Sequence, residues 1–148
     1  MPSKTKIATQ IGLSITLMMA GAAAFAQSKE FTASCSNSGF TGTAYLNGYK
    51  IPGGRSFLVH DYKINAPGDS QSRSSANMNV QSYNNATHHS SAWNKSGDDR
   101  KQDGVTRPIS LGAGTAGDHL NTAIIEFIFD KSGNDPRCTA KVQMPLGG

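Results

Sequence analysis

The two cysteines of this chain, Cys35 and Cys138, each lie on the apolar side of an alternating segment. Phe31, Ala33 and Cys35 alternate with polar residues, and the same alternation runs from Cys138 to Met144. A period of two is typical of a half-buried strand. The pattern therefore predicts that the first and last strands bring the cysteines together as a disulfide inside the core. Such a bridge closes a loop of about 100 residues, which stabilises a fold by roughly 4 to 5 kcal/mol in the chain-entropy model.

The first 26 residues have the features of a cleaved bacterial signal peptide. Lys4 and Lys6 precede an apolar, small-residue-rich run from Ile7 to Phe25, and Ala24-Phe25-Ala26 has the small-x-small pattern of a cleavage site. Cleavage after Ala26 leaves a mature domain of residues 27–148, in which no second run is long enough to span a membrane. We therefore expect an exported protein, periplasmic or extracellular, in a compartment that permits disulfides.

The charge pattern argues against nucleic acid as a partner. The formal net charge is +4, and Lys4 and Lys6 of the predicted leader account for half of it. The remaining basic residues are scattered singly, without the cluster that follows a phosphate backbone. An anionic membrane surface also lacks its usual polybasic segment.

The mature chain reads as short strands separated by turns, which predicts an all-β, single-domain antiparallel β-sandwich. We expect a hairpin at Asn47-Gly48, because both residues accept the positive φ of a two-residue turn. Residues 55–64 form the next predicted strand, with His60 on the same face as Leu58, Tyr62 and Ile64, which indicates a hydrogen-bonded core histidine. Residues 120–130 are apolar on both faces, as in a central strand.

Residues 84–119 are expected to form a long irregular loop, in which only 105–111 looks like a strand. Long irregular segments in compact domains are often functional. This one contains the single tryptophan, Trp93, whose ring can stack on a sugar or instead plug the end of the core. The candidate ligand-binding residues are Trp93, His88, His89, Asp98, Asp99 and Asp103.

Metal binding has weak support. Adjacent residues on a strand point to opposite faces, so His88 and His89 are better explained as solvated loop histidines than as ligands of one ion. Two acidic segments, 98–104 and 130–135, carry oxygens that suit calcium, although neither has EF-hand spacing and both have the composition of ordinary turns. We expect no cofactor, with calcium as the alternative.

Two further motifs can be explained without catalysis. Residues 112–117 match Gly-x-Gly-x-x-Gly, but they lead toward a strand and not a helix, so a flexible glycine loop is expected and not a nucleotide site. Glu126 lies mid-strand, where it could act as an acid or, more commonly, pair with a neighbouring Lys or Arg. No nucleophile, base and orienting group can be recognised together.

These patterns favour a small exported protein that binds a surface glycan or another cell-surface component. One alternative is a secreted toxin or pore-forming protein, in which residues 70–93 would act at a membrane. Another is a small exported hydrolase that uses Glu126, Asp99 or histidine. A structural or inhibitory envelope protein also fits the sequence. The oligomeric state cannot be read from it.

Overall fold

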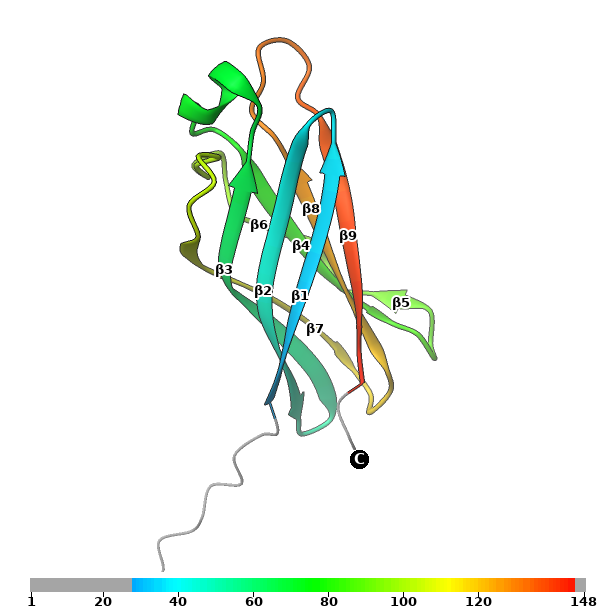
Figure 1. The fold of residues 1–148 in the computed structure, drawn as a ribbon. Coiled ribbons are helices and arrows are strands. Elements are labelled where there is room, and N and C mark those ends of the chain that lie inside the picture. Colours follow the sequence, from blue (N-terminus) through cyan, green and yellow to red (C-terminus); the bar gives the residue numbers. More distant parts are fainter. Residues whose placement is uncertain (1–27, 146–148) are drawn as a thin grey trace, which may run out of the picture.

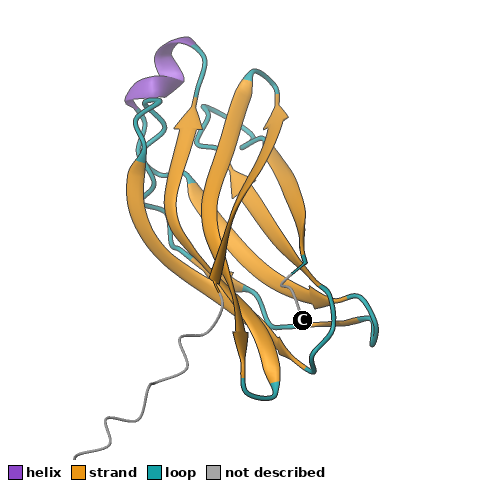
Figure 2. Ribbon diagram, turned by 60° about the horizontal axis from the view of Figure 1, so that its bottom comes forward, coloured by secondary structure: helices purple, strands orange, loops and turns teal. Residues whose placement is uncertain are grey.

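The computed structural model describes residues 28–145, so the predicted leader lies outside the described residues. The elements, in chain order, are β1 Ser28–Asn37, β2 Phe40–Ile51, β3 Gly54–Asn65, the 3₁₀ helix η1 Gly68–Ser72, β4 Asn77–Asn84, β5 His89–Ser90, β6 Asn94–Lys95, β7 Arg107–Ala116, β8 Asn121–Ile128 and β9 Arg137–Met144. Apart from η1, the ordered elements are strands (Figure 2). Within this described part, no helix is long and apolar enough to cross a membrane.

The strands form two antiparallel sheets packed face to face (Figure 1). One sheet has the order β1-β2-β3-β7, and the other has the order β5-β4-β8-β9, with β6 also paired to β4. The core lies between them, where alternate residues point inward: Phe40 stacks on Phe129 with ring centroids 5.0 Å apart. Gly42 of β2 faces the ring of Phe127 of β8, and a Cβ at this glycine would overlap the ring. The predicted all-β sandwich is confirmed.

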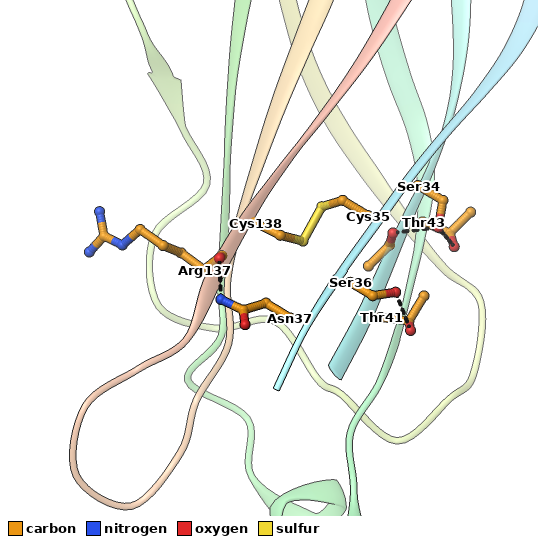
Figure 3. The surroundings of a disulfide bond; sticks show 9 residues. Ser34, Cys35, Ser36, Asn37, Thr41, Thr43, Arg137 and Cys138 are labelled. Atoms are coloured by element: carbon orange, nitrogen blue, oxygen red, sulfur yellow. Dashed lines mark hydrogen bonds between the residues drawn. A yellow bond between two sulfur atoms is a disulfide. The ribbon is translucent and has the colours of Figure 1, made fainter. Parts of the chain in front are cut away.

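The disulfide joins the first and last strands, as the alternation of both segments predicts. Cys35 of β1 and Cys138 of β9 are bonded, with Cα atoms 5.9 Å apart, and so link one edge of each sheet (Figure 3). Two residues along, the side-chain amide of Asn37 donates a hydrogen bond of 2.8 Å to the carbonyl oxygen of Arg137. β8 lies between β4 and β9, in agreement with its prediction as a central strand.

The predicted hairpin at Asn47-Gly48 is wrong. β2 continues through these residues to Ile51, and the chain turns instead at Pro52 and Gly53, with Gly53 at φ +76°. Proline fixes one turn position and glycine accepts the positive φ of the next. The later turn lengthens the hairpin and keeps Gly48 in the inward-facing row of β2.

The face predicted for His60 is also wrong, because β3 contains a bulge at this residue. Val59 pairs with Leu46 and Asp61 pairs with Tyr45, so His60 has no partner of its own on β2. The extra residue changes which side chains face the core. The buried row of β3 is therefore Phe57, Val59, Tyr62 and Ile64. The His60 side chain remains 31% exposed, so it is not a core histidine.

The segment 84–119 is more regular than predicted. Residues 89–100 run antiparallel to β4 along its outer edge, with β5 and β6 as the paired pieces. The backbone N–H of Ser91 donates to the carbonyl oxygen of Ser82, and the Ser91 hydroxyl accepts the Ser82 N–H. Ser96 forms the same two bonds with Met78. These two hydroxyls replace backbone carbonyls, so the β4 edge is covered by an interrupted strand. The glycines at 112 and 114 belong to β7 and not to a loop.

Candidate functional site

The structure does not bring the six candidate ligand-binding residues into one cluster. Asn84 pairs with His89 at one end of β4, whereas Asn77 at the other end is hydrogen-bonded to Asp98. Seven strand residues separate these rows, which corresponds to about 24 Å. The histidines therefore lie at one end of the sandwich and the three aspartates at the other.

The three aspartates are engaged in local pairs. Asp99 accepts a hydrogen bond of 2.7 Å from Arg100 Nε, and Asp103 accepts one of 2.5 Å from Arg107 Nη2. This bond to Arg107 lowers the pKa of Asp103 below its usual value. Within residues 28–145, no group of three or more His, Cys, Asp or Glu side chains could hold a metal ion.

The other titratable candidates also have structural partners. The ring of His88, a residue at φ +58°, forms a hydrogen bond of 2.8 Å between Nδ1 and the hydroxyl of Tyr83. Glu126 accepts a hydrogen bond of 2.8 Å from Asn79 and lies 3.5 Å from Arg137, in agreement with the cross-sheet pairing that its position suggests. His60 Nδ1 is 2.6 Å from Asp61 Oδ2 on the outer surface of β3.

A pocket of about 420 Å³ lies between the β4–β5 region and the end of β7. Its size is within the range of small-molecule sites. Its lining residues share an absence of formal charge (histidine taken as neutral), and the surface they present is mostly apolar with a few hydroxyl, amide and backbone groups: Asn84, Thr87, His89, Ser90, Ser91, Gly114, Thr115 and Ala116. A second pocket of about 410 Å³ at the far end is instead lined by Arg73, Lys101 and Asp103, among others.

Two asparagines join the sheets at and next to the 420 Å³ pocket. Asn84 Nδ2 donates to the carbonyl oxygen of Ala116 at 2.9 Å, and Asn94 Nδ2 donates to that of Gly112 at 3.0 Å.

An ion-paired cluster fixes the loop that follows β7, because Asp118 accepts from Lys50 at 3.0 Å and from Arg55 at 3.0 Å. The bond to Lys50, followed by the bond to Arg55, lowers the pKa of Asp118.

Trp93 lies in the segment that borders this pocket. It follows the lining residue Ser91 by two positions and precedes Asn94, which is bonded to β7. Its side chain is 42% exposed, so it does not plug the end of the core. Of the candidates from sequence, His89 lines the pocket, while His88 and Trp93 lie within a few residues of lining positions.

Sequence reasoning missed the other lining residues. Thr87, Ser90, Ser91 and 114–116 are small and have no periodic pattern, and the only signal for them is the serine and asparagine richness around them. The glycine-rich segment 112–117 is expected to be a flexible loop, but residues 112–116 lie in β7, and three of them, 114–116, line the pocket. No protein-family model, curated protein or solved structure matches the chain.

Proposed function

We propose that the protein is a small exported binding protein that recognises a surface glycan or another cell-surface component, and that the 420 Å³ pocket is its binding site. The observation that carries this proposal is the uncharged lining of the pocket, which is mostly apolar surface with a few hydroxyl, amide and backbone groups. Sugars combine apolar ring faces with hydroxyls and carry little charge, so such a lining complements them.

The free hydrogen-bonding capacity of the lining supports this function. The side chains of Thr87, His89 and Ser90 form no hydrogen bond to another residue within 28–145. Such groups form hydrogen bonds with water in the free protein and are available to ligand hydroxyls. Trp93, two residues along the chain from the lining residue Ser91, is exposed and offers an aromatic face on which the apolar side of a sugar ring can stack.

The proposal of export rests on the leader-like residues 1–26 and on the disulfide. A disulfide between the terminal strands is compatible with an oxidising compartment, such as a periplasm or the extracellular medium. A binding role there needs no cofactor and no catalytic group.

A glycan array probed with oxidised protein of residues 27–148, with calcium and again with EDTA, tests the proposal. We expect specific binding that Trp93→Ala abolishes and that Val105→Ala leaves intact. Val105 is the matched control because its side chain is also exposed, at 51%, and its N–H is bonded to Asp103 at the other end of the sandwich. A blank array with a folded protein, or equal binding by the Trp93→Ala variant, would contradict the proposed site.

A further inference from the structure

The edge of β7 carries an unpaired backbone group inside the pocket. β7 pairs with β3 on one side only. Alternate residues of a strand direct their N–H and C=O groups to the same edge. Because the carbonyls of Gly112 and Ala116 accept bonds from Asn94 and Asn84 of the other sheet, Gly114 between them also directs both its groups away from β3. Apart from the ladder with β3, no described residue forms a hydrogen bond to either group of Gly114.

The other sheet supplies a second free hydrogen-bonding group to the pocket. Ser90 of β5 lines the pocket, and its hydroxyl has no partner within residues 28–145. A trans secondary amide has its N–H and C=O on opposite sides. It can therefore accept from the Gly114 N–H with one side and donate to the Ser90 hydroxyl with the other.

We propose that the pocket binds the acetamido group of an N-acetylated amino sugar between Gly114 and Ser90. This inference rests on the proposed function and names its ligand class. The acetamido group meets the unpaired backbone group of Gly114, while the ring hydroxyls meet Thr87 and His89. The lining contains no carboxylate that would favour a free amino group and no Lys or Arg that would favour an acid.

The two asparagine bonds distinguish an amino sugar from an extended peptide. A peptide strand added to an edge pairs with successive residues along it. Here the carbonyls on both sides of Gly114 are already occupied by Asn84 and Asn94, and these positions are about 14 Å apart along the strand. A compact ligand with one amide fits this gap, whereas a peptide strand would displace both asparagines.

Calorimetric titration of the oxidised protein, residues 27–148, tests the ligand class. The probes are N-acetylglucosamine and N-acetylgalactosamine against glucose, galactose and glucosamine, with N-acetylglycine N-methylamide as the peptide probe. We expect the N-acetylated sugars to bind at least about tenfold more tightly than the other probes, since a well-made hydrogen bond contributes roughly this factor. In ¹⁵N–¹H spectra, the Gly114 amide should shift strongly on addition of N-acetylated sugar.

A pair of substitutions isolates the Gly114 N–H. Gly114→Pro removes it, and proline is tolerated where an edge strand directs its N–H away from the sheet. A Cβ at this position would lie 2.9 Å from Ser56 Cβ and 3.0 Å from the Arg55 carbonyl oxygen. Both Gly114→Pro and its control, Gly114→Ala, are made in a Ser56→Gly background, which removes the first contact and leaves the second equal in the two variants. We expect the proline variant to lose the preference for N-acetylated sugars and the alanine variant to keep it.

The outcomes separate this inference from the proposed function. Equal affinity for N-acetylated and parent sugars would overturn the inference and leave a glycan-binding pocket. Preferential binding of the peptide probe would overturn it in favour of a peptide ligand. No binding of any sugar by wild-type protein, with no shift at Gly114, would contradict both. If the proline variant does not fold, the inference is decided by the wild-type protein alone, from its relative affinity for N-acetylated and parent sugars and from the shift of its Gly114 amide signal.

Discussion

The side-chain amide of Asn84, at the end of β4, donates a hydrogen bond of 2.9 Å to the carbonyl oxygen of Ala116 on β7 of the other sheet. The amide oxygen of the same residue accepts the N–H groups of Ala86 at 2.9 Å and Thr87 at 3.1 Å. Asn84 is 1% exposed. One buried side chain therefore shapes the β4–β5 turn and joins it to the opposite wall of the pocket.

Asn84→Asp should destabilise the fold by about 1–3 kcal/mol, because it keeps the acceptor for the turn but places an oxygen against the Ala116 carbonyl. Urea unfolding followed by circular dichroism measures this loss. Asn134→Asp, in an exposed loop, is the control and should have little effect. Equal stability of the two variants would show that the bond between the sheets contributes nothing.

Gln102 has a corresponding role at the far end of the sandwich. It is fully buried, and its amide nitrogen donates to the carbonyl oxygens of Ser70 at 2.6 Å and Asp130 at 2.7 Å, while its oxygen accepts the Asp130 N–H at 3.0 Å. Gln102→Ala removes three hydrogen bonds to the backbone. The Ser70 carbonyl keeps its bond from the Arg73 N–H, but the N–H and C=O of the half-buried Asp130 lose these partners, so we expect a loss of about 2–4 kcal/mol. Thermal unfolding against the exposed-residue control Gln71→Ala tests this, and a matching Tm would contradict it.

The parts of the fold that the sequence predicts correctly are those with a local signal. The alternation around Cys35 and Cys138 is maintained over whole strands, and the pairing of two cysteines needs no knowledge of the residues between them. The two apolar faces of residues 121–128 likewise indicate a central strand in any sandwich. Each of these signals is a repeated pattern that a single irregular residue does not erase.

The errors arise where one residue or a competing turn changes the register. The apolar and aromatic residues around His60 fit a regular alternation equally well, and only the pairing of β3 with β2 reveals the bulge. Asn47-Gly48 is a good turn sequence by itself, but the hairpin that turns at Pro52-Gly53 forms more cross-strand pairs. Both outcomes depend on the partner strand, which local propensity does not specify.

The candidate site was only partly predictable for a similar reason. His89 and the neighbourhood of Trp93 were identified because those residue types are chemically distinctive. The backbone of Gly114 and the hydroxyl of Ser90 carry no such signal, and they become notable only because strands of the two sheets bring both into the lining of one pocket. The aspartates at 98, 99 and 103 are near in sequence to the histidines but lie at the other end of β4.

The disulfide should contribute about 4–5 kcal/mol to the free energy of unfolding, because it spans 103 residues and restricts the unfolded chain. The double variant Cys35→Ser/Cys138→Ser should lose this amount in guanidinium unfolding. Reduction of the wild-type protein provides the control and should produce a loss of the same size. An unchanged midpoint on reduction would mean that the bridge does not limit the unfolded state.

The ion pairs of Asp118 predict a specific loss of stability in acid. Lys50 and Arg55 lower the pKa of Asp118 in the folded state below its usual value of 3.8. The ionised carboxylate therefore stabilises the fold at a pH above 3.8, and this stabilisation is lost as the pH falls through the folded-state pKa. Asp118→Asn should therefore lower the Tm at neutral pH, and the Tm difference from wild type should become smaller once the pH falls below the usual pKa of an aspartate. Asp69→Asn is the control, because Asp69 has no ion pair among the described residues. A Tm difference for Asp118→Asn that stays constant from neutral to strongly acidic pH would contradict an electrostatic role for this cluster.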